Sequence, residues 1–254
     1  MIDSHIHTEF SSDSEMKLQH GIEIARKLGI GMTITEHLDL KFPTGTDFTF
    51  DIDKYFIDYE KHRSSNFMLG IEVGMQLTCL EENREVVNKY PFDYVIGSIH
   101  VANGQDIFEP EAYEGKTKKE LFEEYFSSMV ECVKQYDFID CLGHIDYISR
   151  YATYNDKEIH YHEFKEYIDE VLKAIVNNGK VMEINTRRFN DVEAYNNLIN
   201  IYKSYNKMGG KYITIGSDAH HAEDIGNNFI LANRICEICN LKPVYFKNRK
   251  MEYM

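Results

Sequence analysis

The sequence lacks any excess of positive charge. Its 28 lysines and arginines face 42 aspartates and glutamates, which gives a formal net charge of −14 at pH 7. A surface of this sign repels phosphate backbones and anionic headgroups, which argues against nucleic-acid or anionic-membrane binding as the main activity. A small phosphorylated substrate remains possible, because bound cations can reverse the sign of the field locally.

Long apolar runs and an even set of cysteines are also missing. No run approaches the roughly 18 residues that a membrane-spanning helix needs, so we expect no membrane association. With 15 Gly, 4 Pro and 43% hydrophobic residues, the composition is typical of a globular chain with a sizeable core. Five cysteines cannot all pair, and no signal peptide is recognisable, so we expect a reducing cytoplasm rather than a disulfide framework. Cys236-x-x-Cys239 lies in a segment typical of a helix, which favours packing over a metal or redox role.

Seven short apolar segments recur along the chain, and most of their residues are β-branched or aliphatic. They are Ile2–His5, Gly31–Thr35, Met68–Val73, Tyr94–Ile99, Phe138–Leu142, Val181–Asn185 and Tyr212–Ile215. Runs of this length suit strands that are covered on both faces. Five longer segments have helical periodicity, and Gly29 is expected to end the first of them. These are Glu15–Leu28, Lys119–Val133, Phe164–Val176, Asp191–Met208 and His221–Cys239.

Strands that alternate with helices predict an α/β fold with a parallel sheet. Because no dinucleotide-binding glycine fingerprint follows the first strand, a closed barrel is favoured over an open doubly wound sheet. No linker, low-complexity segment or repeat interrupts the chain, so we expect residues 1–254 to form a single domain. The loops 39–51 and 102–118 are long enough to act as lids or substrate loops.

Metal-binding residue types gather where the predicted strands end. The nine candidates are His5, His7, Asp13, His37, Glu72, His100, His144, Asp218 and His220. In an αβ barrel all strands open onto one face at their carboxyl ends, where active sites form. A single histidine is more often a hydrogen-bonded core or loop residue than a metal ligand. Six histidines at the ends of predicted strands are difficult to explain by chance. The other five are expected on helix or loop surfaces, namely His20, His62, His160, His162 and His221.

Nine nitrogen and carboxylate ligands exceed the four or five that a single zinc-type ion takes. They suit two to three divalent ions that share a bridging carboxylate. Ions roughly 3.5–4 Å apart activate water at neutral pH and stabilise both oxygens of an in-line displacement. Because no cysteine joins the set, we expect a hydrolytic Zn, Mn or Fe site rather than a structural zinc. The sequence therefore predicts metal-assisted hydrolysis.

The motifs resemble those of the polymerase-and-histidinol-phosphatase (PHP) superfamily, in the family's order. They are Asp3-x-His5-x-His7-Thr8, Thr35-Glu36-His37, Gly70-Ile-Glu72, Ser98-Ile-His100, Gly143-His144-Ile-Asp146 and Gly216-Ser-Asp218-Ala-His220. Glu183-Ile-Asn-Thr186 and the closing segments 216–226 and 244–249 are similar to the stand-alone histidinol-phosphate phosphatases of histidine biosynthesis. The resemblance implies a distorted seven-stranded, TIM-like (β/α)7 barrel and a trinuclear site. It also implies a phosphatase that hydrolyses L-histidinol phosphate.

The resemblance further implies a role for each ligand. One ion would be held by His5, His7, Glu72 and Asp218. Glu72 would bridge to a second ion, completed by His100 and His144. Asp13, His37 and His220 would hold a third, with Glu9 and Glu15 as competitors for the place of Asp13. Glu36 would point away from the ions and orient a ligand.

Phosphate binding needs further cations, and a forked guanidinium matches phosphate oxygens best. The candidates are Arg150 and either Arg187 or Arg188, acting beside His37 and His220. Asp106 and Glu109 are candidates to hold the amine and imidazole of the substrate.

Two other hypotheses remain open. The first is the same chemistry on another phosphomonoester or a phosphodiester, such as a nucleotide, a phosphotyrosine protein or a DNA 3′ end. The second is a non-catalytic metal-binding domain, which the presence of all nine ligand positions disfavours.

Overall fold

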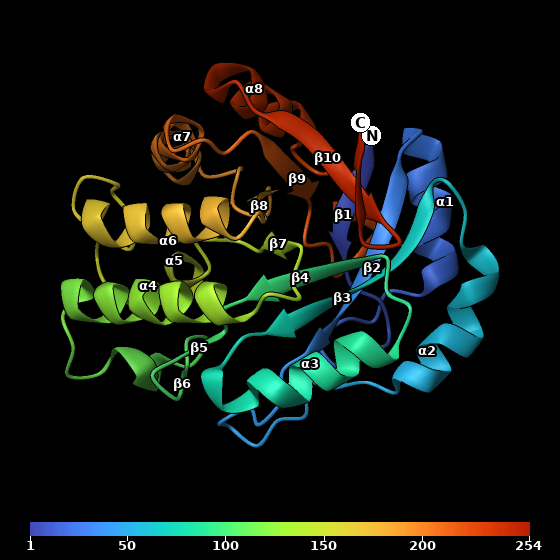
Figure 1. Ribbon diagram of the computed structural model, residues 1–254, viewed down its shortest axis with the longest axis horizontal. Helices are drawn as coiled ribbons and strands as arrows, with labels where there is room; N and C mark the ends of the chain where they lie inside the picture. Colours follow the sequence, from blue (N-terminus) through green and yellow to red (C-terminus); the bar gives the residue numbers. More distant parts are fainter.

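The computed structural model describes residues 1–254 and is an α/β fold built on a mostly parallel sheet (Figure 1). Nine strands form this sheet in the order β1-β2-β3-β4-β7-β8-β9-β10-β11, and only the last pair is antiparallel. They are β1 Ile2–Ile6, β2 Gly31–Leu38, β3 Phe67–Gly74, β4 Tyr94–Ser98, β7 Cys141–Leu142, β8 Val181–Asn185, β9 Tyr212–Gly216, β10 Lys242–Lys247 and β11 Lys250–Tyr253. A separate hairpin pairs β5 Val101–Ala102 with β6 Gln105–Asp106.

Eight α-helices lie around the strands (Figure 1). They are α1 Leu18–Leu28, α2 Ile52–Tyr59, α3 Leu80–Lys89, α4 Lys118–Gln135, α5 Ile148–Tyr151, α6 Lys165–Asn177, α7 Val192–Lys207 and α8 Phe229–Cys239. Gly29 ends α1 as predicted, with φ 69°. The predicted helix His221–Cys239 was wrong in its first half, because Gly226 (φ 70°) and Asn228 (φ 58°) adopt left-handed conformations that delay α8 to Phe229.

Every predicted strand segment contains a strand, but the predicted count of seven was wrong. Strands β10 and β11 extend the sheet beyond β9. They escaped prediction because β10 is only partly buried, β11 has no buried residue, and each strand begins with a lysine. Asn248 (φ 50°) and Arg249 (φ 62°) form the tight turn between them, in the conformation that two-residue hairpins favour.

The predicted closed barrel is not confirmed, because the ladder of strands runs from β1 to β11 without returning to its start. The first and seventh parallel strands nevertheless approach one another beyond their ends. An isolated bridge joins Ile6 to Ala219, the amide of His7 donates to the carbonyl of Ala219 at 2.9 Å, and the amide of Asp218 donates to the carbonyl of His5 at 2.9 Å. These contacts bring the residues after β9 beside those of β1.

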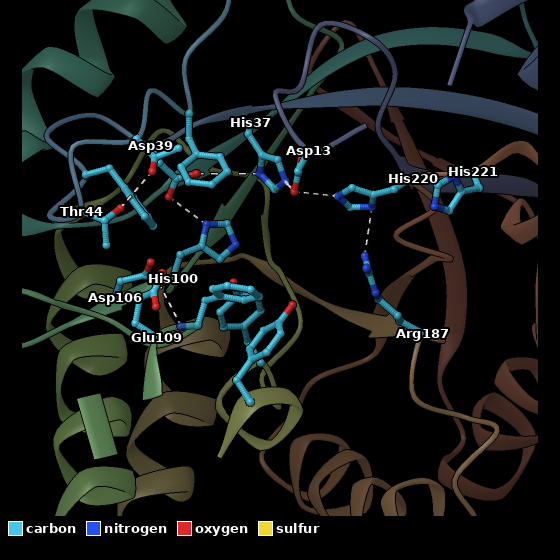
Figure 2. Close-up of a pocket in the computed structure, with 16 residues that line it drawn as sticks. Asp13, His37, Asp39, Thr44, His100, Asp106, Glu109, Arg187, His220 and His221 are labelled. Carbon is cyan, nitrogen blue, oxygen red and sulfur yellow. Dashed lines mark hydrogen bonds and ion pairs between the residues drawn. The ribbon is translucent and has the colours of Figure 1, made fainter. Parts of the chain in front are cut away.

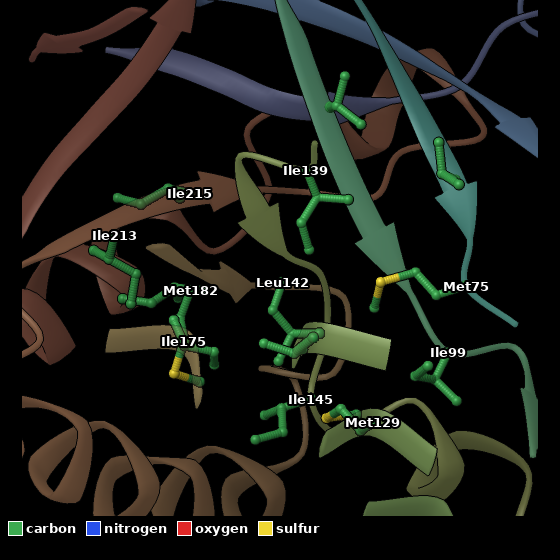
Figure 3. Close-up of a cluster of buried hydrophobic side chains, with 14 of the residues drawn as sticks. Met75, Ile99, Met129, Ile139, Leu142, Ile145, Ile175, Met182, Ile213 and Ile215 are labelled. Atoms are coloured by element: carbon green, nitrogen blue, oxygen red, sulfur yellow. The ribbon is translucent and has the colours of Figure 1, made fainter. Parts of the chain in front are cut away.

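The hydrophobic core lies between the strands and the helices that cover them. Its main cluster joins 62 buried residues, among them Met129 of α4, Ile175 of α6, and Leu142 and Met182 of the sheet. Figure 3 shows part of this cluster. Cys236 and Cys239 also belong to this cluster and carry free thiols, as expected of a packing role. None of the helices combines the length and apolarity that crossing a bilayer requires. The apolar residues of the strands form the core, whereas polar residues gather at the carboxyl ends of the strands.

Candidate metal centre

The strand ends bring the nine predicted ligands together. Eight are buried, while the side chain of Asp13 is 42% exposed. Five sets of three residues have ligand atoms within 4.8 Å of one another. They are His5–His7–Glu72, His5–His144–Asp218, Glu72–His100–His144, His7–His37–His220 and His37–Asp39–His100. Because the sets share members, the ligand atoms form one continuous cluster rather than separate sites.

Glu72 stands at the centre of this cluster. Its Oε2 lies 2.9 Å from His37 Nδ1, 3.3 Å from His5 Nε2 and 3.4 Å from His7 Nε2. Its Oε1 lies 2.9 Å from His144 Nε2 and 3.4 Å from His100 Nε2. The two oxygens of one carboxylate therefore face different histidines, which is the arrangement that a bridging ligand requires.

Four histidines are fixed from behind through Nδ1. Within 3.1 Å of these nitrogens lie Glu183 Oε1 for His5, Ser11 Oγ for His7, Asp39 Oδ1 for His100 and the carbonyl of Asp218 for His220. A partner at Nδ1 orients the ring and leaves Nε2 as the nitrogen that can bind a metal, as in metal-bound histidines. In each case Nε2 is directed towards the carboxylates of the cluster.

Several buried polar atoms of the cluster make no hydrogen bond. They include Glu72 Oε2, His37 Nδ1 and His100 Nε2. Such orphaned atoms are costly in a protein interior unless something else satisfies them. Their convergence, together with a donor set of imidazoles and carboxylates, fits divalent cations of the Zn, Mn or Fe type.

Local charges pull the pKa values of the cluster in opposite directions. Burial raises the pKa of Glu72, but the positive charges of His5, His37 and His100 outweigh it and hold that pKa well below its usual range. Burial and the neighbouring His37 and His220 lower the pKa of His7 well below its usual value, which favours the neutral form of this ring. Burial lowers the pKa of His100, but the negative charges of Asp39 and Glu72 outweigh burial and raise that pKa to about 9.

The predicted third-ion residues lie where the cluster meets a cavity of about 360 Å³ (Figure 2). Asp13 Oδ2 lies 3.2 Å from His220 Nε2 and 3.5 Å from His37 Nε2. Its predicted competitors lie elsewhere, since Glu9 pairs with Lys17 and Glu15 is exposed. Both long loops line this cavity, through Asp39, Phe42, Thr44, Thr46 and Phe48 of the first and Asp106, Phe108 and Glu109 of the second.

The three candidate arginines have different surroundings. Arg187 lines the cavity, and its Nη1 lies 3.0 Å from His220 Nδ1 and 3.3 Å from Asp218 Oδ1. Arg150 is buried, and its Nη1 donates to Asp218 Oδ2 at 2.6 Å. Arg188 is not brought to the cavity, because its guanidinium pairs with the buried carboxylates of Asp146 and Glu158.

The acids at the mouth lie across the cavity from Arg187. Figure 2 shows Asp106 and Glu109 on one side and Arg187 with His220 on the other. Asp106 is largely buried, and that burial raises the pKa of its carboxyl group. The aromatic rings of Phe108, Tyr147 and Tyr151 complete the wall. The cavity thus has a cationic end beside the metal ligands and an acidic, aromatic end.

Comparison with known proteins decides the family. The model of the PHP domain matches residues 3–187, which carry seven of the nine clustered ligands. The chain belongs to the PHP domain family. The resemblance predicted from the motifs is therefore confirmed.

The PHP chain has close relatives over its whole length. It is 51% identical over 253 residues to a protein of Clostridium acetobutylicum named "Probable histidinol-phosphatase", covering 100% of this chain and 99% of that one. It is 32% identical over 229 residues to the histidinol-phosphatase of Lactococcus lactis, covering 87% and 85% of the two chains. The crystal structure of the L. lactis histidinol phosphate phosphatase with zinc, L-histidinol and phosphate matches with a TM-score of 0.94 and 30% identity, over 99% of this chain and 98% of that one.

Sequence reasoning missed several residues of the PHP site. Asp39 follows His37 by two residues, so alternation along the extended chain could have placed both on one face. His221 was expected on a helix or loop surface, and it is exposed, but it also lines the cavity. Glu36 does point away from the cluster, as expected, and it accepts a hydrogen bond from Ser11 Oγ at 2.5 Å, the hydroxyl that contacts His7.

Proposed function

We propose that this chain is a metal-dependent phosphomonoesterase that hydrolyses L-histidinol phosphate to L-histidinol and phosphate. The observation that carries the proposal is the convergence of six histidines on Glu72 and its neighbouring acids, beside a cavity with one cationic and one acidic end. The 51% identity to a protein named as a histidinol-phosphatase supports the choice of substrate. A non-catalytic metal-binding domain would not need the substrate-sized cavity.

Two to three divalent cations would be held by the clustered ligands. His5, His7, Glu72 and Asp218 would hold the first. Glu72, His100 and His144 would hold the second, and Asp13, His37 and His220 the third. The close sets His5–His7–Glu72 and Glu72–His100–His144 support this division for the first two ions. When bound, the cations supply Lewis acidity to the phosphate and lower the pKa of a coordinated water.

The protein's own residues position and neutralise the phosphate. Arg187 reaches the cavity directly and would contact the phosphate oxygens, while Arg150 holds Asp218 in place and adds a buried positive charge. Such preorganised charge stabilises the developing charge of phosphoryl transfer. His37 and His220 flank Asp13 at the cavity wall, next to where the scissile bond would lie. We infer that Arg187, rather than Arg188, is the arginine of this pair that binds phosphate.

The acidic end of the cavity would receive the cationic end of the substrate. Histidinol phosphate carries a charged amine and an imidazole on one side and a phosphate on the other. Asp106 and Glu109 lie across the cavity from Arg187, so a substrate of this polarity fits in one orientation only. The aromatic rings of Tyr147 and Tyr151 offer flat surfaces for the imidazole.

Three further features complete the proposal. We infer that the first seven strands of the sheet, β1 to β9, form a distorted barrel that β10 and β11 extend at one edge. Its seam would lie between β1 and β9, which the hydrogen bonds of His7 and Asp218 support. We infer one domain over residues 1–254, because the sheet order runs without a break along the chain. We also infer a cytoplasmic location, which the five free and buried thiols support.

The test is kcat/KM of metal-analysed protein on L-histidinol phosphate, on a phosphodiester and on an aryl phosphate. We expect kcat/KM for histidinol phosphate to exceed the values for the other two substrates by several orders of magnitude. His100→Ala should fold normally and lose turnover, and so serves as the inactive control. Equal and slow rates on all three substrates would keep a metallohydrolase but reject this substrate.

A further inference from the structure

Two polar residues on β8 face the centre of the site, and neither is among the nine clustered ligands. Glu183 and Asn185 are two apart on a strand, so their side chains leave the same face. Both are almost completely buried. Buried polar side chains at a strand end need a full set of partners, so their hydrogen bonds reveal what they hold.

Glu183 accepts three hydrogen bonds, all from the site. Its Oε1 lies 2.7 Å from His5 Nδ1, and its Oε2 accepts from the amide of His144 at 2.8 Å and from Asn185 Nδ2 at 3.2 Å. A carboxylate can only accept, so His5 must carry its proton on Nδ1. The other ring nitrogen, Nε2, faces His7, Glu72 and Asp218 and is the one that would bind a metal.

The neighbouring strand leaves room for this carboxylate. A Cβ atom at Gly216 of β9 would lie 2.3 Å from Glu183 Oε1 and 2.4 Å from the Cβ of His5. Any other residue at position 216 would therefore push apart the pair that Glu183 forms with His5. The absence of a side chain at this position is an observation independent of the hydrogen bonds, and it points to the same contact.

Asn185 continues the connection to the arginines. Its Oδ1 accepts from Arg150 Nη2 at 3.1 Å and from the amide of Arg187 at 3.2 Å. Its Nδ2 donates to Glu183 Oε2 and, at 3.3 Å, to Asp218 Oδ2. One amide therefore contacts both arginines that approach Asp218, and it also contacts the carboxylate behind His5.

We propose that Glu183 and Asn185 are positioning residues that align the metal ligand His5 with Arg150 and Arg187 through one buried hydrogen-bonded chain. The proposal rests on the proposed function in that these arginines serve the phosphate. Glu183 sets the tautomer of His5, and Asn185 holds the guanidinium of Arg150 and the backbone amide from which the Arg187 side chain starts. Their main effects differ, because Glu183 contacts the ring of His5, whereas only Asn185 contacts the arginines.

The first test replaces Glu183 by Gln. The new amide must turn its NH2 either towards His5 Nδ1 or towards the two donors at Oε2, and each choice loses hydrogen bonds. We expect zinc affinity to fall about 10- to 100-fold, as it does when the partner of a metal-bound histidine is lost. The readout is the zinc dissociation constant of chelator-treated protein, measured without substrate.

The matched control is Asp93→Asn. Asp93 is another buried carboxylate, at the opposite end of the sheet, where it accepts from the amides of Leu69 and Asn248. The Asp93→Asn substitution should lower the thermal stability of the protein and leave its zinc affinity unchanged. If Glu183→Gln does not fold, nitrogen NMR of the zinc-loaded wild type replaces it, and an exchange-protected proton on His5 Nδ1 is expected. Unchanged zinc affinity in Glu183→Gln, or a His5 Nδ1 without a proton, would overturn the role of Glu183.

The second test replaces Asn185 by Ala and uses inorganic phosphate as the probe. We expect the dissociation constant of phosphate on the zinc-loaded protein to rise about tenfold, with zinc content at the wild-type level. Asn83→Ala is the control, since Asn83 is buried but bonds to Gly74 and Tyr136 instead. Unchanged phosphate binding in Asn185→Ala would overturn its role. Neither readout depends on histidinol phosphate, so failure of the proposed substrate would leave both tests valid.

Discussion

Glu72 Oε2 lies 2.9 Å from His37 Nδ1, both atoms are buried, and neither makes a hydrogen bond. The contact joins β3 to β2 at the point where their carboxyl ends meet. Buried polar atoms without a hydrogen bond are costly unless cations bound beside them satisfy them. This pair is therefore the most direct structural sign of a metal centre.

Removing the cations should lower the stability of the fold. A ligand that binds only the native state stabilises it by about 2.7 kcal/mol at 100 times its dissociation constant. We expect chelation to lower the melting temperature by several degrees and zinc to restore it, measured by thermal denaturation. An identical melting curve before and after verified metal removal would contradict the proposed centre.

Metal affinity should increase with pH. In the metal-free protein Asp39 and Glu72 raise the pKa of His100 to about 9 despite its burial. This ring is therefore protonated at neutral pH, and a metal must displace its proton. Metal affinity therefore rises as the pH approaches 9, where His100 loses its proton, and levels off above that pH. Calorimetry at pH 7 in buffers of different ionisation enthalpy should detect proton release, and its absence would argue against His100 as a ligand.

The neighbours Arg187 and Arg188 should respond differently to replacement by alanine. Arg187→Ala should lower kcat/KM by about 10- to 100-fold, the range of a charged hydrogen bond, because its half-exposed side chain borders the cavity. Arg188→Ala should instead destabilise the fold by about 3 kcal/mol, because it leaves the buried Asp146 and Glu158 without their partner. Steady-state kinetics and urea unfolding on both variants separate the two roles. Reversed effects would refute the assignment.

The acids at the cavity mouth should matter only for substrates that carry a positive charge. Asp106→Asn and Glu109→Gln should raise KM for histidinol phosphate, because each removes a carboxylate from the end opposite Arg187. An aryl phosphate without a positively charged group provides the comparison, and its kcat/KM should hardly change. Equal losses on both substrates would mean that these acids support the site without recognising the amine.

Much of the site follows from the sequence because strand geometry is regular. His5 and His7 leave the same face of a strand, and parallel strands bring Glu72, His100 and His144 to one edge. Arg187 and Arg188 could not be separated in this way. They follow the end of β8, where alternation no longer fixes the direction of a side chain, and tertiary partners at Asp218 and Asp146 decide it.

The fold was less predictable at its ends and turns. Strands β10 and β11 carry lysines and little buried surface, so their pattern resembles a polar tail. The start of α8 depends on left-handed residues at Gly226 and Asn228, which interrupt a segment whose apolar periodicity continues. Glu183 was visible on β8, but its partner His5 lies 178 residues away in the chain. Contacts over such distances depend on the register between strands, which no local pattern contains.

The most direct test of the account is a zinc titration of metal-free protein, with kcat/KM for L-histidinol phosphate measured at each step. The account predicts negligible activity without metal and a rise that is complete only after two to three equivalents have bound. Full activity in verified metal-free protein, or saturation after a single equivalent, would contradict it.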